Sequence, residues 1–320
     1  MKAAVVESFD RPPRYADFRE PVAKDGEVLI RVKAAALSNL VKGQTSGKHY
    51  SSGSEMPFVA GNDGVGTLSD GRRVYFIGPT APFGSMAELC AMPEARTIAL
   101  PDALDDVTAA ALGNPGLASW GALIGRAHIQ PGETVLVNGA TGVAGQQAIQ
   151  VAKYLGAKRV IATGRDAAAL ERLKELGTEE TISLLQPDAD LQAAFARAIH
   201  EEGVDIVLDY LWGKSAELFL KAAAGHGSAK GERRIRFVQI GSMSGGSITL
   251  EAQTLRSSGL ELLGSGLGSL SAKAIIESLK TMYAAAGSTV LKIETETAPL
   301  SEVETMWGKA ESGRRLVFTI

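Results

Sequence analysis

The chain has 320 residues, of which 33 are basic and 36 acidic, so its formal net charge at pH 7 is only -3. This length accommodates two domains with separate cores, and the absence of a domain-scale basic patch argues against nucleic-acid binding. No apolar run reaches membrane-spanning length and no signal peptide is evident. The single cysteine, Cys90, excludes an internal disulfide. We therefore expect a cytoplasmic protein with no membrane or nucleic-acid partner.

The first hundred or so residues read as short strands separated by turns. Residues 27–33 and 73–77 are typical of strands, and Gly61–Gly66 predicts a glycine-rich turn ahead of the second of them. Cys90 is expected to be a small buried residue rather than a nucleophile. This part of the chain is therefore predicted to be mostly β.

From about Asp105 the pattern changes to alternating helices and strands, which predicts right-handed crossovers and a doubly wound parallel sheet. The tail no longer alternates, because a helix near 272–286 is followed by a last strand at 316–320. We therefore expect the tail to fold back onto the first domain. The strands of the parallel sheet are predicted at 134–138, 159–163, around 181, 204–209, 235–240 and near 260.

The most informative segment runs from Val135 to Gly145. An apolar strand leads into a turn with the spacing of the dinucleotide fingerprint, except that alanine stands at the first glycine position. Gly142 would let the backbone approach a pyrophosphate, and Gly145 would let the following helix pack closely on its strand. The free amides and the dipole of the helix would attract phosphate. The alternative is a tight turn without a ligand; the predicted cofactor contacts here are Ala140, Thr141, Gly142, Val143 and Ala144.

The end of the next strand indicates which dinucleotide is bound. NAD-binding proteins usually place a carboxylate there, whereas this strand ends in Gly164 and Arg165. A guanidinium fork suits a 2′-phosphate, and the glycine leaves room for it. Asp166 could instead reach the ribose, although a helix N-cap is the favoured interpretation. We therefore predict NADPH as the cofactor.

Two more cofactor contacts are expected at the carboxyl end of a later strand. Gly241 and Ser242 follow the strand at 235–240, and the carboxyl ends of parallel strands border the cofactor crevice. Plain turn geometry is the alternative for a glycine in such a position.

Several landmarks together resemble a known family, the zinc-independent, zeta-crystallin-like quinone oxidoreductases of the medium-chain dehydrogenase/reductase superfamily. The similarity covers nearly the whole chain and is more specific for the superfamily than for the substrate. Besides the glycine turn and its strand, it rests on residues 1–6, 32–39, 61–66, 114–120, 131–137, 204–213 and 239–242.

The resemblance implies an architecture. A Rossmann NADP-binding domain, residues 116–258, would be flanked by a mostly β, chaperonin-10-like (GroES-like) catalytic domain made of residues 1–115 and 259–320. It also implies a cleft between the domains and a homodimer. In the family, the counterpart of the glycine-rich segment that contains Gly266 passes the nicotinamide, so Gly266 is added to the cofactor contacts.

The resemblance also implies that no metal is bound. Zinc-dependent relatives carry a cysteine near Ser38 and Gly-His-Glu where this chain has Gly61-Asn62-Asp63. Serine and asparagine do not replace a thiolate and an imidazole as zinc ligands. Asp63 is expected to be a hydrogen-bonded turn residue, and the four histidines show no ligand spacing.

Three residues are candidates for the substrate side. Asn39 and Tyr50 match the family's asparagine and tyrosine, and Asn62 replaces the zinc histidine. An amide and a phenol can donate hydrogen bonds to a quinone or enone oxygen. The alternatives are that Asn39 caps a helix and that Tyr50 is an exposed loop aromatic. The family's threonine near the nicotinamide is Ala118 here, so that contact is absent or moved to Ser119.

The sequence thus predicts a zinc-independent, NADPH-dependent oxidoreductase that transfers hydride to a quinone or a similar electron-poor, conjugated carbonyl. An enoyl or 2-alkenal double-bond reductase remains an alternative, since the same donors would serve it. A third possibility, from another class, is a nucleotide-binding structural or sensor protein with little turnover.

Overall fold

The computed structural model of the chain describes residues 1–224, 233–287, 291–309 and 313–320. These residues form two compact units, which we call unit 1 and unit 2 and describe separately. Within the described ranges, no helix is long and apolar enough to cross a membrane.

Unit 2 contains Pro115–Ser278 together with Val290–Lys292 and is built on a six-stranded sheet. Every pairing in this sheet is parallel, and its order is β11-β10-β9-β12-β13-β14. The order reverses at β9, as in a dinucleotide-binding sheet, so the predicted doubly wound fold is confirmed. The strands are β9 (Thr134–Asn138), β10 (Arg159–Gly164), β11 (Glu180–Ser183), β12 (Ile206–Asp209), β13 (Arg234–Gln239) and β14 (Gly259–Gly264).

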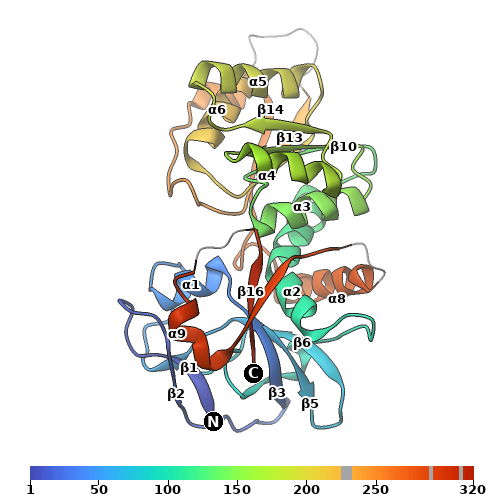
Figure 1. Cartoon of the computed structure of the whole chain (residues 1–320). Helices are drawn as coiled ribbons and strands as arrows, with labels where there is room; N and C mark the ends of the chain where they lie inside the picture. Colours follow the sequence, from blue (N-terminus) through green and yellow to red (C-terminus); the bar gives the residue numbers. More distant parts are fainter. Residues whose placement is uncertain (225–232, 288–290, 310–312) are drawn as a thin grey trace. The chain divides into compact units, whose positions relative to one another are not determined.

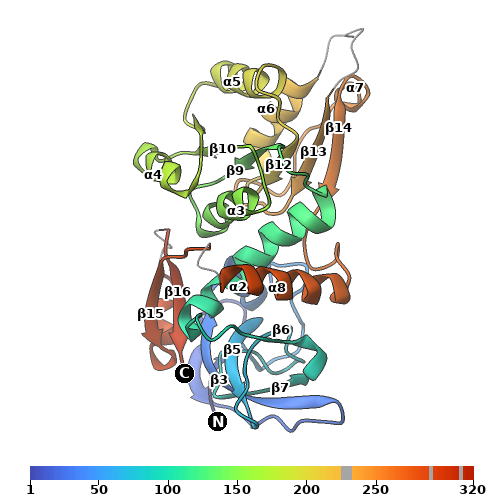
Figure 2. The same cartoon turned by 90° about the vertical axis from the view of Figure 1, so that its right-hand side faces the viewer.

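Helices cover both faces of this sheet, α5 and α6 on one face and α3 and α4 on the other (Figures 1 and 2). Between the sheet and the first pair lies an aromatic core in which Phe195, Phe219 and Phe237 are almost fully buried. Because both faces are covered, the central strands β9, β10 and β12 are buried almost throughout and do not alternate between buried and exposed residues. The helical elements are α3 (Val143–Tyr154), α4 (Ala167–Arg172), η3 (Leu173–Leu176), α5 (Asp188–His200), α6 (Gly213–Ala223) and α7 (Ala252–Arg256).

The tail leaves unit 2 later than the expected boundary at residue 259. β14 pairs along its whole length with β13, from Arg234 opposite Gly259 to Gln239 opposite Gly264. A parallel strand needs this ladder for its backbone groups, so β14 completes the sheet of unit 2. The chain enters unit 1 again at Leu279, inside helix α8 (Ala272–Ala286).

Unit 1 contains Met1–Asn114, Leu279–Thr289 and Ile293–Ile320. Its larger sheet has the order β15-β16-β3-β5-β6-β8, with β7 also paired to β3, and a smaller sheet has the order β2-β1-β4. The strands are β1 (Lys2–Val6), β2 (Arg14–Asp17), β3 (Glu27–Ala36), β4 (Phe58–Val59), β5 (Asp63–Leu68), β6 (Arg73–Ile77), β7 (Leu89–Pro93), β8 (Thr97–Ala99), β15 (Thr295–Pro299) and β16 (Arg315–Thr319).

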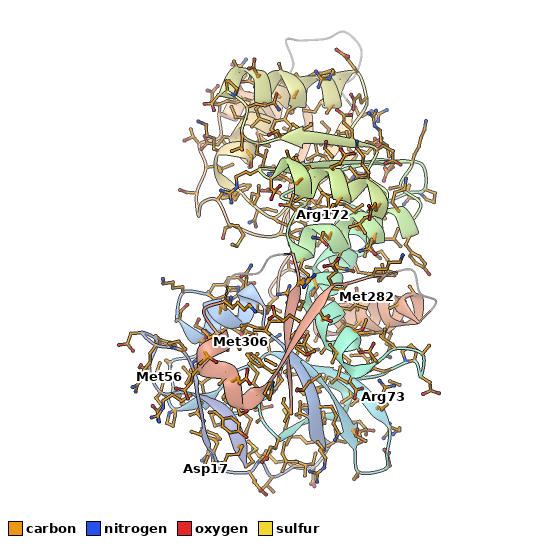
Figure 3. All side chains as sticks on the ribbon, in the orientation of Figure 1. Asp17, Met56, Arg73, Arg172, Met282 and Met306 are labelled. Carbon is orange, nitrogen blue, oxygen red and sulfur yellow. The ribbon has the colours of Figure 1, made fainter. Side chains whose placement is uncertain are left out.

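Helices and the tail complete unit 1. Tyr283 of α8 donates a hydrogen bond of 2.8 Å to the carbonyl of Ala109, which fastens α8 to α2. Phe318 of β16 is fully buried, and Met306 packs against the same cluster (Figure 3). The last strand therefore belongs to the core built by the first third of the chain. The helical elements are α1 (Asn39–Thr45), η1 (Glu94–Arg96), α2 (Asp106–Trp120, which continues into unit 2), η4 (Leu300–Glu302) and α9 (Val303–Met306).

The glycine-rich turn predicted at Gly61–Gly66 is wrong, because β5 already begins at Asp63. Its glycines serve close packing between strands. A Cβ on Gly66 would lie 2.5 Å from the carbonyl oxygen of Arg31, and one on Gly64 would lie 3.0 Å from that of Ala34. The pairing of β3 with β5 shifts register at this point, so the backbones come close together.

Candidate functional site

The glycine turn in unit 2 lies between β9 and α3. Gly142 is the N-cap of α3 and is exposed, and no side chain caps this end of the helix. A Cβ on Gly142 would meet no atom within 4 Å, so the space in front of the helix is open. The first amides of α3, those of Val143 and Ala144 among them, have no intrahelical partner there. The arrangement is suited to bind an anion.

Gly145 has the role that its position in the fingerprint predicts. A Cβ there would lie 2.5 Å from both Cα of Ala140 and the carbonyl oxygen of Gly139. The helix therefore packs against its own turn more closely than any side chain permits. Ala140 is itself fixed to the neighbouring strand, because its N–H donates a 2.8 Å hydrogen bond to the carbonyl of Thr163.

Gly164 at the end of β10 packs against the turn. A Cβ on this glycine would lie 2.5 Å from Cγ2 of Thr141. The buried Gly164 thus brings the end of β10 against the glycine turn, and Arg165 follows it directly. Close packing therefore requires this glycine, whereas the sequence had suggested that it leaves open room for a phosphate.

Arg165 and Asp166 have different roles. The Asp166 carboxylate is the N-cap of α4 and accepts a 3.0 Å hydrogen bond from the amide of Ala169, so the N-cap prediction is confirmed. Arg165 is exposed, and among the described residues it has neither a hydrogen-bond nor an ion-pair partner. Its guanidinium is therefore available to an anionic ligand.

A buried polar network beneath the turn was not predicted. Nδ2 of Asn138 donates to the carboxylate of Asp209 at 2.8 Å and to Oγ of Ser215 at 2.9 Å, while Oδ1 of Asn138 accepts from Thr163 at 2.7 Å. The carboxylate of Asp209 also accepts a 3.1 Å hydrogen bond from the amide of Trp212, a residue whose φ of 57° lies in the left-handed region. The network fixes the carboxyl ends of β9, β10 and β12 relative to one another.

Burial raises the pKa of Asp209 above its ordinary value, although the hydrogen bonds from Asn138 and from the backbone oppose this shift. The signal in the sequence is slight: Asn138 and Asp209 are each a polar last residue that directly follows three apolar residues of its strand.

Gly241 and Ser242 lie at the same edge of the sheet. The amide of Gly241 donates a 3.1 Å hydrogen bond to the carbonyl of Asp209. A Cβ on Gly241 would lie 2.6 Å from the carbonyl oxygen of Tyr210, so close packing requires the glycine. Ser242 is exposed directly beyond it. The glycine turn, Arg165 and Ser242 therefore all lie at the carboxyl ends of the strands of this sheet.

The hydroxyl of Ser119 is committed to the structure of unit 2. Ser119 is fully buried and lies 3.0 Å both from the carbonyl of Pro115, to which it donates, and from the hydroxyl of Tyr210. The expected contact of a hydroxyl with the nicotinamide is therefore not transferred to Ser119.

The candidates for the substrate side all lie in unit 1. Asn39 is the exposed first residue of α1, and the N-cap is Ser38, whose Oγ accepts from the amide of Val41 at 3.3 Å. Asn39 thus does not cap the helix. Tyr50 is 73% exposed in the turn after α1 and stacks on the ring of His49, with centroids 4.2 Å apart.

Asn62 and Asp63 lie at the start of β5. Nδ2 of Asn62 is buried and has no hydrogen-bond partner within the described part of the chain. Asp63 is buried and accepts a 3.0 Å hydrogen bond from Tyr75. Burial raises the pKa of Asp63 from 3.8 to about 6 despite that bond and the positive charge of Arg315. Asp63 is thus a hydrogen-bonded residue as expected, but in a strand.

No metal centre is evident in the described ranges, which contain no group of three or more His, Cys, Asp and Glu side chains that could hold an ion. Cys90 is buried, and burial raises the pKa of its thiol to about 12. A thiol with such a pKa remains protonated near neutral pH and is a poor nucleophile, and the predicted burial of Cys90 is confirmed.

Comparisons with known proteins support one superfamily. A family model described as zinc-binding dehydrogenase matches residues 144–284. The probable NADPH-dependent quinone reductase tdiC of Emericella nidulans is 29% identical, over 99% of both chains. The human quinone oxidoreductase is 28% identical over 66% of each chain. The quinone oxidoreductase of Thermus thermophilus, solved also in complex with NADPH, is 28% identical and superimposes with a TM-score of 0.80 over both entire chains.

Proposed function

This chain belongs to the quinone oxidoreductase-like family of the medium-chain dehydrogenase/reductase superfamily, and on that premise we propose that it transfers hydride from NADPH to a quinone or a similar electron-poor carbonyl. Two proteins that are similar over nearly the whole length of the chain are named as a quinone reductase and a quinone oxidoreductase. The proposal needs a cofactor site in unit 2 and hydrogen-bond donors for the acceptor in unit 1.

The observation that carries the proposal is the uncapped start of α3 beside Arg165. The open space at Gly142 and the free helix amides fit a pyrophosphate. The unpartnered guanidinium at the end of β10 fits the 2′-phosphate that distinguishes NADPH from NADH. NADPH is thus the cofactor that these residues fit. When bound, it supplies the hydride that reduces the acceptor.

The acceptor side is proposed to use Asn39, Tyr50 and Asn62. Transfer of one hydride to a quinone gives an anion whose negative charge lies on oxygen, and this anion takes up one proton to give the hydroquinone. Amide and phenol donors stabilise this developing charge without titrating near neutral pH. Asn62 has an unpartnered buried donor, Nδ2, which an acceptor oxygen would satisfy.

We propose that this chemistry proceeds without zinc. The residue at the position of the family's cysteine ligand, Ser38, has its hydroxyl bound to the backbone of α1. Asp63, in place of the glutamate, is held by Tyr75. Neither side chain is arranged as a zinc ligand. Quinones and conjugated carbonyls are electron-poor, so their reduction needs less help from a Lewis acid than the oxidation of an alcohol does.

A homodimer remains a prediction from the family resemblance. β14 is an edge strand of the sheet of unit 2, and its Leu262 is 38% exposed. Edge strands of this kind can pair with a second copy. Sedimentation at micromolar concentration would test it, and a single monomeric species would contradict it.

A spectrophotometric acceptor screen tests the proposed reaction. Purified protein is mixed with NADPH or NADH and with a panel of quinones and enones, with and without a chelator. We expect NADPH absorbance to fall with at least one quinone, a hydroquinone product, and no effect of the chelator. A saturated ketone as the product would favour the double-bond reductase instead. Binding of NADPH without oxidation across the panel would favour a structural or sensor protein, and activity lost on chelation and restored by zinc would contradict the metal-free reaction.

A further inference from the structure

The loop that follows β14 lies at the edge of the sheet where the proposed cofactor would bind. The glycine turn follows β9, and Arg165 follows β10 on one side of the switch point. In a doubly wound sheet the other half of the dinucleotide lies across β12, β13 and β14. The amide of Ser265 donates a 2.8 Å hydrogen bond to the carbonyl of Gln239, so the loop starts beside the end of β13. We call residues 264–269 the β14 loop.

The β14 loop is closed by its own hydrogen bonds. The amide of Gly266 donates to Oγ of Ser269 at 2.7 Å, and the amide of Ser269 donates to the carbonyl of Gly266 at 3.0 Å. The amide of Gly266, a cofactor contact expected from the family resemblance, is therefore already used within the loop. What this loop offers a ligand is its shape and its exposed backbone at Gly264, Gly266 and Gly268.

Arg126 joins both ends of the β14 loop. It belongs to η2 (Gly121–Ala127), a π-helical segment that continues α2. Its Nε donates to the carbonyl of Gly264 at 2.8 Å, and its Nη1 lies 3.5 Å from the carbonyl of Ser269, to which it also donates. A planar guanidinium can bridge two carbonyls in this way, whereas an ammonium cannot do so with the same geometry.

A second contact holds the residue after the loop. The side chain of Leu270 lies over two glycines of the same segment, because a Cβ on Gly121 or on Gly125 would come within 2.8 Å of its methyl groups. Gly121 and Gly125 are four residues apart in η2 and together form the surface on which Leu270 packs, which we call the glycine seat. π-helical segments are frequent at functional sites, and here the segment carries both contacts to one loop.

We propose that Arg126 and the glycine seat of Leu270 are a positioning device that holds the β14 loop against the nicotinamide half of NADPH, without touching the cofactor themselves. This inference rests on the proposed function. In this proposal the two halves of the cofactor are bound by different residues. Arg165 and the glycine turn would bind the adenosine half and the pyrophosphate, whereas the positioning device would affect only the nicotinamide half.

The test compares two ligands, NADPH and 2′-phospho-ADP-ribose, which lacks the nicotinamide. The variants are Arg126→Ala, Arg126→Lys and Gly125→Ala. Arg233→Ala is the matched control. Arg233 also donates to a backbone carbonyl, that of Gly203, but it lies at the amino ends of the strands, opposite the carboxyl ends where the β14 loop lies. We expect Arg126→Ala and Gly125→Ala to raise the Kd for NADPH about tenfold and to leave the Kd for the fragment within about twofold of wild type. Arg126→Lys should be intermediate, and the control should change neither Kd.

Equal losses for both ligands would indicate general damage to unit 2 and would overturn the proposal, as would unchanged NADPH binding in both Arg126 variants. Circular dichroism and Tm identify variants that fold. If Arg126→Ala or Gly125→Ala fails to fold, Arg126→Lys, which keeps the charge and the length, still provides the comparison. A wild-type protein that binds neither ligand would instead refute the proposed function, and the inference with it.

Discussion

At the scale of single residues, the preference for NADPH depends on Arg165. Its side chain is exposed and, in the ranges that the structure describes, unpartnered, while the carboxylate of the neighbouring Asp166 is occupied by the cap of α4. A carboxylate that already accepts a backbone amide is less suited to bind the ribose hydroxyls of NADH. The pair therefore favours a phosphorylated ribose.

Replacing Arg165 by alanine is expected to raise the KM for NADPH by roughly 10- to 100-fold and to leave the KM for NADH nearly unchanged, because a hydrogen bond to a charged group contributes about 1.5–3 kcal/mol. Arg172→Ala is the control, since Arg172 is likewise an exposed arginine but lies at the other end of α4 (Figure 3). Steady-state kinetics with both cofactors measure the effect. Equal losses for NADPH and NADH would contradict the assignment of the phosphate.

A second prediction concerns Asp63, whose pKa is raised from 3.8 to about 6, chiefly by burial. Between these values the folded state holds a proton that the unfolded state has released, so the free energy of unfolding falls as the pH rises through this window and levels off above it. The loss amounts to about 3 kcal/mol.

Asp63→Asn removes this titration, so the difference in unfolding free energy, wild type minus variant, should fall from about pH 4 to about pH 6 and then stay constant. Urea denaturation across this range measures it. Asp17→Asn, which makes the same substitution at an exposed carboxylate of β2 (Figure 3), is measured alongside as the control. A difference for Asp63→Asn that does not vary with pH would contradict the prediction.

At the scale of elements, β9, its turn and α3 form one functional unit in which two glycines have separate tasks. Gly145 permits close packing of the helix, with only 2.5 Å between its would-be Cβ and the turn. Gly142 faces open space, at φ -78°, which alanine also adopts without strain. Stability and cofactor binding are therefore separable by two substitutions three residues apart.

We expect Gly145→Ala to lower the free energy of unfolding by about 1–3 kcal/mol, since the added methyl group must displace backbone. Gly142→Ala should leave stability within about 0.5 kcal/mol of wild type and weaken NADPH binding about tenfold, because its methyl group occupies the space for the pyrophosphate. Chemical denaturation and fluorescence titration measure the two effects. A Gly142→Ala protein that binds NADPH as wild type would show that the pyrophosphate lies elsewhere.

At the scale of the molecule, unit 1 is assembled from distant parts of the chain. β16 pairs antiparallel with β3 and parallel with β15, so the last residues lie inside the sheet that the first third of the chain begins. Arg315 of β16 is buried and donates a 2.8 Å hydrogen bond to the carbonyl of Leu37, just ahead of α1 and Asn39. The tail therefore supports the backbone that carries a proposed substrate residue.

Phe318→Ala should lower the free energy of unfolding by about 3–5 kcal/mol, because Phe318 is fully buried. Thr319→Ala, at the exposed neighbouring position, should change it by about 0.5 kcal/mol or less. Chemical denaturation compares the two variants. Similar, small effects would mean that the tail contributes little to the core of unit 1.

Local pattern determined much of this protein. The six strands of the parallel sheet, the helix at 272–286, the glycine turn and the N-cap at Asp166 all follow from hydrophobic periodicity and cap chemistry, which act over a few residues. The sequence also placed Gly145 correctly, because its role depends only on the strand, turn and helix that adjoin it. These features are local, and a single sequence contains what they need.

Only the tertiary structure decided what depends on residues far apart in the chain. Asn138 and Asp209 form a network because β9 and β12 are neighbours in the sheet, although 71 residues separate them. The glycines after Gly61 belong to a strand because β3 comes close to them, and β14 stays in unit 2 because β13 satisfies its backbone. Arg126 finds its hydrogen-bond acceptor, the carbonyl of Gly264, only because the end of β14 lies next to η2 in the folded chain. Pairing and packing at long range set these positions, and no local pattern encodes them.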